Sequence, residues 1–86
     1  MYTVIVDKEV TKALKKLPPH EQRRLIKKIE ELAKEPRPAG VKALQGKWHG
    51  FYRCRVGDYR IIYNVEERLL TTCIVKVAHR GHVYAD

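Results

Sequence analysis

The sequence is short of acidic residues and contains no long apolar run. It has 10 Asp and Glu against 18 Lys and Arg, which gives a net charge of +8. Such an excess of positive charge points to a polyanionic partner, with nucleic acid as the first class and an acidic protein as the second. No apolar run approaches the length of a membrane span, and the amino terminus lacks the features of a signal peptide. We therefore expect a cytoplasmic protein without a membrane partner.

Cysteine is also scarce, which excludes two further classes of protein. Cys54 and Cys73 lack the spacing of a zinc site and are too few for a disulfide framework, so we expect buried, reduced thiols. His79 and His82 have no carboxylate or cysteine at ligand spacing, and we expect no metal or other cofactor. The length of 86 residues suits one domain, residues 1–86, with a single core.

The densest positive charge falls in residues 51–63, FYRCRVGDYRIIY. In residues 52–56 apolar side chains alternate with arginines, which is the period of a strand with one buried and one polar face. The Gly57-Asp58 pair favours a two-residue hairpin turn, after which residues 59–65 continue as a second strand. We therefore predict a tight β-hairpin here.

A two-residue turn also fixes which side chains face each other across the hairpin. The predicted pairs are Val56 with Tyr59, Arg55 with Arg60, and Arg53 with Ile62. Like charges placed directly opposite destabilise a sheet by up to roughly 1 kcal/mol. A bound anion removes this repulsion, and guanidinium groups match the geometry of phosphate. We therefore interpret Arg53, Arg55 and Arg60 as a phosphodiester-binding group rather than as charges that only solubilise a strand.

The other elements follow from periodicity and from the positions of proline. We predict a first strand over residues 2–6, a helix capped by Asp7 and ended by Pro18, a helix over residues 19–34, a loop over 36–50 and a last strand over 69–78. Trp48 in the loop suits a lid over the core better than a base-stacking platform. The fold class is α+β with order β-α-α-β-β-β. We expect a mostly antiparallel sheet, the helical hairpin on one face, and the arginines on the other, open face.

The pattern YRCRVGDYRIIY followed by VKVAHRGHVY, on this order of elements, resembles the RelE family of bacterial toxin ribonucleases in the RelE/ParE superfamily. GDYRIIY and VAHRGHVY are its specific parts. The resemblance implies a microbial RNase-like RelE fold and a type II toxin that enters the ribosomal A site, cleaves mRNA and inhibits translation. It also implies neutralisation by a cognate, acidic, RelB-like antitoxin, with operator DNA bound only through the toxin–antitoxin complex.

The expected catalytic group combines the hairpin arginines with residues of the carboxyl-terminal tail, namely Arg53, Arg55, Arg60, Arg80, His82 and Tyr84. Expected RNA contacts are Lys42, Lys47, Arg53 and His79. Arg80 and Tyr84 come from the family's motif. Either histidine, with an ordinary pKa near 6.5, suits acid–base chemistry, and the identity of the general base stays open.

This chain departs from the family pattern in two respects. Many relatives have a further carboxyl-terminal helix, for which this chain has no room. Relatives also often have lysine where this chain has Arg53 and Arg55. Deprotonating a guanidinium with a pKa near 13 at pH 7 costs about 8 kcal/mol, so arginine is a poor general base. We therefore assign the hairpin arginines to electrostatic stabilisation of the phosphorane.

Two other functions fit parts of the sequence. A ParE-type toxin shares the fold and acts by binding DNA gyrase without RNA chemistry, but its relatives usually lack the full set of strand arginines and the late tyrosine. A small basic protein that binds nucleic acid without catalysis is the other alternative, and it would bind any RNA in a uniformly salt-sensitive way.

Overall fold

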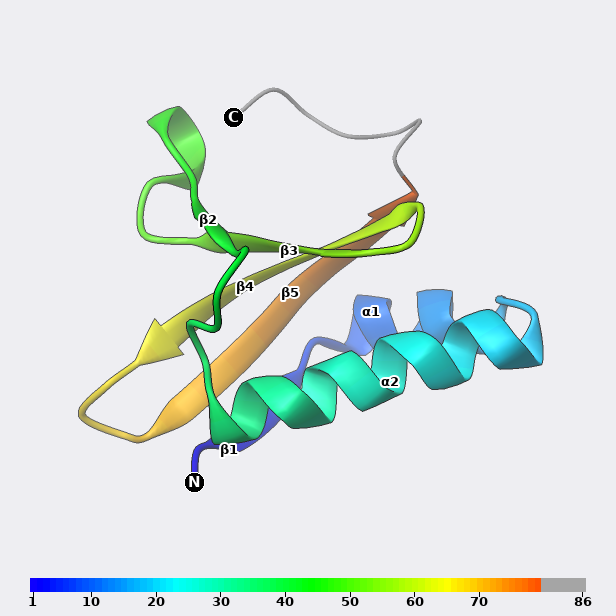
Figure 1. Ribbon diagram of the computed structural model, residues 1–86, viewed down its shortest axis with the longest axis horizontal. Helices are drawn as coiled ribbons and strands as arrows, with labels where there is room; N and C mark the ends of the chain where they lie inside the picture. Colours follow the sequence, from blue (N-terminus) through cyan, green and yellow to red (C-terminus); the bar gives the residue numbers. More distant parts are fainter. Residues whose placement is uncertain (80–86) are drawn as a thin grey trace.

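The structure is a computed structural model that describes residues 1–79, so the predicted site residues Arg80, His82 and Tyr84 lie outside the described residues. The elements are β1 (Thr3–Val6), α1 (Lys8–Lys15), α2 (Pro19–Lys34), β2 (Lys42–Ala43), the 3-10 helix η1 (Gly46–Trp48), β3 (Tyr52–Val56), β4 (Tyr59–Glu66) and β5 (Thr71–His79). The strands form one sheet in the order β1-β5-β4-β3-β2, with both helices on one face (Figure 1).

Capping residues and prolines set the bounds of the two helices. The Asp7 carboxylate accepts a hydrogen bond of 2.9 Å from the Glu9 amide, which satisfies a donor in the first turn of α1. Pro19 lies in the first turn of α2, where a missing N–H is tolerated. Apolar side chains of both helices, namely Val10, Leu14, Leu25, Ile29 and Leu32, are buried against the sheet. Neither helix within residues 1–79 is long and apolar enough to span a membrane.

The predicted hairpin is confirmed with its register, because Val56 pairs with Tyr59 and Arg55 pairs with Arg60. The β4–β5 pair is antiparallel as well. β1 pairs with β5 in parallel, and the connection between these two strands runs through both helices and the strands β2, β3 and β4. The predicted α+β class and the order of the long elements are therefore confirmed.

Two predicted boundaries were wrong. The loop predicted over residues 36–50 contains the short strand β2 and the 3-10 helix η1. The last strand begins at Thr71 because Leu69 and Leu70 belong to the turn after β4, where their side chains are 71% and 53% exposed. Leu70 has a φ of 47°, a left-handed conformation that turns permit and strands do not. Apolar composition alone therefore placed the start of β5 too early.

The sheet face away from the helices is not fully open, which corrects the prediction. Leu44, Ile62 and Ala78 are buried there, although none belongs to the cluster beneath the helices. In Figure 1 the segment that includes β2 and η1 rises on this side of the sheet. The ring of Trp48, which is half-buried, meets the ring of Phe51 edge-on at 5.4 Å between centroids. A second, smaller apolar cluster therefore supports the face that carries the arginines.

Candidate nucleic-acid interface

Strand register brings basic residues from three strands into one row that crosses four strands of the sheet. Lys42 pairs with Arg53, Arg53 pairs with Ile62, and Ile62 pairs with Lys76. Paired residues on neighbouring strands point to the same face, so three of the four side chains in this row are cationic. Ile62 is fully buried and forms the apolar floor between them.

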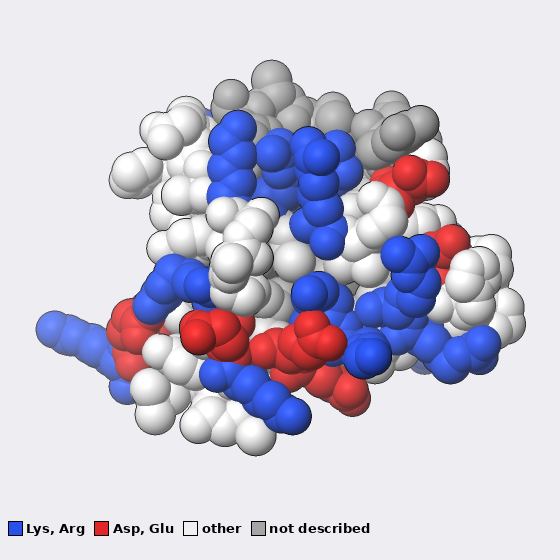
Figure 2. Space-filling view, in the orientation of Figure 1, with Lys and Arg blue, Asp and Glu red and all other residues white. Residues whose placement is uncertain are grey.

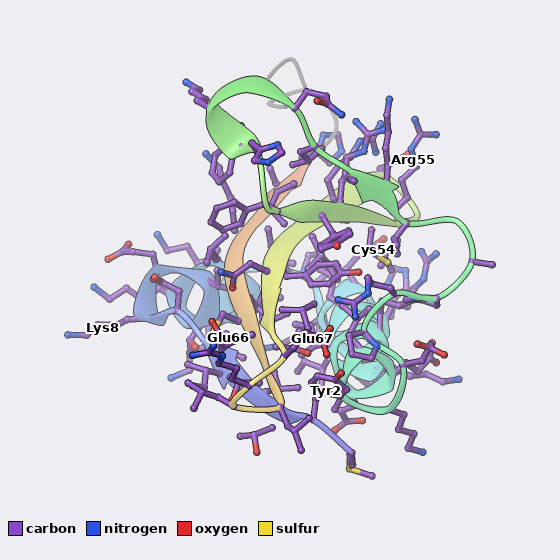
Figure 3. The ribbon with its side chains drawn as sticks, turned by 90° about the vertical axis from the view of Figure 1, so that its left-hand side faces the viewer. Tyr2, Lys8, Cys54, Arg55, Glu66 and Glu67 are labelled. Atoms are coloured by element: carbon purple, nitrogen blue, oxygen red, sulfur yellow. The ribbon has the colours of Figure 1, made fainter. Side chains whose placement is uncertain are left out.

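A second row runs parallel to the first, nearer the hairpin turn. Arg55 pairs with Arg60, and Arg60 pairs with Ala78. Arg55 is exposed, whereas Arg60 and Arg53 of the first row are half-buried. Figure 3 shows that Arg55 and its neighbour Cys54 project to opposite sides of β3, with Cys54 toward α2. The predicted face of the three arginines is therefore the one observed.

The charge on this face is nearly all of one sign. Between Pro36 and Tyr63 the only acidic residue is Asp58, in the hairpin turn. In Figure 2, one group of Lys and Arg side chains lies in the upper part of the view, away from the helices, whereas lower down other Lys and Arg side chains are mixed with most of the acidic ones. Partial burial strengthens the attraction of Arg53 and Arg60 for an anion, because the surrounding dielectric is lower than that of water. Together the rows suit a chain of phosphates better than a single small anion.

Lys76 is a basic residue of this face that the sequence prediction missed. It is exposed and is the only charged residue in the apolar run from Leu69 to Ala78. A lone charge within an apolar strand signals a position that faces solvent. The sequence did not show that this position lies in the same row as Arg53, because that depends on the pairing of β4 with β5.

The other predicted RNA contacts fall in different places. Lys47 is exposed on η1, in the segment that rises on the side of the sheet away from the helices in Figure 1. His79 pairs with Tyr59 and meets its ring edge-on, with 5.3 Å between centroids. Tyr59 packs against the cluster beneath the helices, so the structure does not bring His79 onto the arginine face. Within residues 1–79, no three Asp, Glu, His or Cys side chains lie together in a way that could hold a metal ion.

Arg37, another basic residue of the loop region, belongs to a separate cluster at the other end of the molecule. Its Nη2 donates to Oε1 of Glu67, and the Tyr2 hydroxyl donates to Oε2 of the same carboxylate at 2.7 Å. These bonds, from Tyr2 first and Arg37 second, lower the pKa of Glu67. Figure 3 shows Tyr2 and Glu67 together, far from Arg55. Arg37 therefore does not add to the basic rows.

Comparison with known proteins shows what the chain is similar to. Residues 4–84 match the family described as the ParE toxin of the type II toxin–antitoxin system. Toxin RelG of Mycobacterium tuberculosis is 31% identical over 84 residues, which cover 96% of this chain and 95% of that toxin.

Solved structures of two toxin–antitoxin complexes are similar as well. The RelE–RelB complex of Pyrococcus horikoshii matches with a TM-score of 0.82 and 38% identity, covering 95% of this chain and 98% of that chain. The RelBE2 complex of M. tuberculosis matches with a TM-score of 0.82 and 30% identity, covering 92% and 98%.

Proposed function

Since the chain belongs to the RelE/ParE superfamily of type II toxins, we propose that it is an endoribonuclease that cleaves mRNA in the ribosomal A site and thereby inhibits translation. The observation that carries the proposal is the pair of basic rows on the outer sheet face, above all Arg55 directly opposite Arg60. A sheet that served only stability would avoid such a pair. An RNA phosphodiester supplies the negative charge that the pair lacks.

In the proposed reaction the ribose 2′-oxygen attacks the adjacent phosphorus while the bond from phosphorus to the 5′-oxygen breaks. The products are a 2′,3′-cyclic phosphate and a 5′-hydroxyl. Negative charge develops on the non-bridging oxygens of the phosphorane, and guanidinium groups fixed on β-strands stabilise it without reorganising. Arg55 and Arg60 take this role, while Arg53, Lys42 and Lys76 hold neighbouring phosphates.

The proton transfers fall to other groups, because a guanidinium does not release its proton near pH 7. We assign them to His82 of the tail, whose ordinary pKa suits taking the 2′-hydroxyl proton and passing it to the departing 5′-oxygen. The family resemblance places Arg80 and Tyr84 in the same tail. Arg80 would stabilise the negative charge that develops on the leaving oxygen, and Tyr84 would orient the hydroxyl or stack on a base. His79 is a weaker candidate, since its side chain shares a sheet face with Tyr59 and not with the arginines.

We further propose that the ribosome positions the mRNA. The basic rows attract any phosphate chain, and fixing the 2′-oxygen in line with the bond that breaks requires additional contacts. Cleavage of free RNA should then be slow or absent. Because solved relatives are RelE–RelB complexes, a cognate acidic antitoxin is the expected inhibitor. It would cover the basic face, and operator DNA would be bound only through the toxin–antitoxin complex.

A ParE-type function, binding of DNA gyrase without RNA chemistry, is the second candidate, and the family match to ParE toxins favours it. The two functions differ in what the outer face must do. A gyrase-binding toxin needs no phosphodiester site, so growth arrest by that route should survive neutralisation of the Arg55–Arg60 pair.

The deciding experiment is mRNA cleavage on programmed ribosomes, with cut sites mapped at single-nucleotide resolution. We expect the wild type to cut in the A site and Arg55→Ala and Arg60→Ala to lose about 100-fold or more in rate, as when an oxyanion-stabilising donor is removed. Arg23→Ala, which removes an exposed charge from α2, is the matched control. Growth arrest without cleavage, unchanged in Arg60→Ala, would replace the endonuclease with the gyrase-directed function.

A further inference from the structure

The turn of the arginine hairpin lies against the side chain of Arg24 on α2. A Cβ placed on Gly57 would lie 2.9 Å from Nη1 and 3.0 Å from Nη2 of Arg24. The first distance is shorter than real Cβ contacts and the second is tighter than most of them, so a side chain at position 57 would have to displace the guanidinium of Arg24. This contact joins the helical layer to the end of the hairpin that carries Arg55 and Arg60.

The turn alone explains why residue 57 is glycine, but it does not explain the approach of Arg24. Gly57 has a φ of +59°, which glycine adopts without strain in a two-residue hairpin. Arg24 is half-exposed, and its Nη1 lies 3.8 Å from Oε2 of Glu21, one turn earlier on α2. Arg24 therefore lies between the turn and the Glu21 carboxylate, although half of its side chain is exposed to solvent.

The contact also has an electrostatic consequence. Arg55 and Arg60 are close to the turn in sequence and directly opposite each other, so their mutual repulsion favours fraying of the hairpin end. Arg24 adds a further positive charge beside this end. Asp58 in the turn and Glu21 on α2 supply negative charge near this added cation. An arginine at position 24 can hold the end of the hairpin in place and also keep the electrostatic potential there positive, which favours binding of an anion.

We propose that Arg24 is a positioning residue that holds the hairpin turn against α2 and thereby fixes the Arg55 and Arg60 side chains for the reaction. This inference rests on the proposed endonuclease function, because that reaction gives the fixed geometry its purpose. Arg24 acts through the backbone of Gly57 and does not contact the reacting atoms. Loss of the contact should lower the rate of the chemical step more than the binding of programmed ribosomes.

The first test compares Arg24→Ala with Arg23→Ala, which removes the same charge from an exposed position on the same helix. For Arg24→Ala we expect kcat to fall about 10-fold or more with little change in KM, since small misplacements of reacting groups are costly. Arg23→Ala should leave kcat unchanged. Arg24→Lys should keep kcat low, because an ammonium restores the charge but not the contact that both terminal nitrogens of the guanidinium make with the turn.

A double-mutant cycle isolates the contact from backbone strain. Gly57→Ala introduces both a left-handed alanine and a clash with Arg24. Gly46→Ala is the matched control, since Gly46 has a φ of +64° and nothing within 4 Å of an added Cβ. We expect Gly57→Ala to lower kcat much less in the Arg24→Ala background than in the wild type. Equal effects in both backgrounds would overturn the proposal.

Nuclear magnetic resonance gives a readout that does not depend on activity. The order of the Nε–Hε groups of Arg55 and Arg60 should fall in Arg24→Ala and stay unchanged in Arg23→Ala. If the wild type cleaves no RNA but this order still falls, the endonuclease function is wrong and the positioning role stands. If order and kcat are the same in the Arg24 and Arg23 variants, Arg24 has no positioning role.

Discussion

Arg55 and Arg60 face each other next to a two-residue turn, where opposite charges or apolar side chains would stabilise the sheet better. Their position followed from local sequence, since a Gly-Asp turn between alternating residues dictates which side chains meet. The partial burial of Arg60 could not be predicted from local sequence, because it depends on chain segments that lie far away in sequence. The pairing of these two arginines was therefore predictable from the sequence because turn chemistry fixes the register of the hairpin.

The Arg55–Arg60 pair should cost stability in the absence of an anion. We predict that Arg55→Ala leaves the free energy of unfolding unchanged or raises it by up to about 1 kcal/mol at low salt, because it removes repulsion between the paired guanidinium groups. Urea unfolding measures this effect, and Arg23→Ala controls for the loss of net charge. A clear loss of stability in Arg55→Ala alone would show that the pair stabilises the hairpin.

Tyr63 supports the fold from the opposite sheet face. It is fully buried, and its hydroxyl donates to the Pro36 carbonyl at 2.6 Å. Burial raises the pKa of this hydroxyl. We predict that Tyr63→Phe lowers the free energy of unfolding by about 1–3 kcal/mol near pH 8, because the carbonyl loses its donor.

This difference should shrink at high pH. The unfolded tyrosine loses its proton near pH 10, while the folded one stays protonated, so wild-type stability falls as the pH rises above about 10. Tyr63→Phe lacks this contribution. Urea unfolding at pH 8 and pH 11 should therefore bring the two proteins closer together, and a gap of constant size would contradict the raised pKa.

Among the elements, the two helices and the three long strands were predictable because each has a clear period, cap or proline boundary. The segment from β2 to η1 was not, since its order comes from contacts with distant residues. β2 exists only because Lys42 and Ala43 pair with β3. Leu44, which directly follows β2, is buried on the outer face of the sheet. Neither contact has a local signal in a stretch rich in glycine and proline.

The outer apolar cluster should contribute to stability as much as a conventional core does. Leu44 is 2% exposed, so we predict that Leu44→Ala costs roughly 2–5 kcal/mol through lost burial and a cavity. Leu69→Ala is the matched control at a leucine that is 71% exposed, and it should change stability by less than about 0.5 kcal/mol. Similar small losses in both variants would mean that the segment after β2 is not anchored.

At the scale of the whole molecule, the two faces of the sheet differ in what covers them and in their charge. The helices cover one face and supply most of the core, while the other face combines a small apolar cluster with acid-free basic rows (Figure 1, Figure 2). Composition predicted a polyanionic partner but not where it would bind. The parallel β1–β5 pair and the row that includes Lys76 depend on long-range pairing, which the single sequence did not reveal.

The central claim is cleavage of mRNA through its own 2′-hydroxyl on the ribosome. The most direct measurement compares three substrates for the wild-type protein, namely an mRNA on programmed ribosomes, the same mRNA with a 2′-deoxy sugar at the A-site cut position, and the free mRNA. We predict cleavage of the first, with a 2′,3′-cyclic phosphate end, and slow or absent cleavage of the other two. Equal cleavage of the deoxy substrate, or no cleavage on ribosomes at all, would contradict the proposed function.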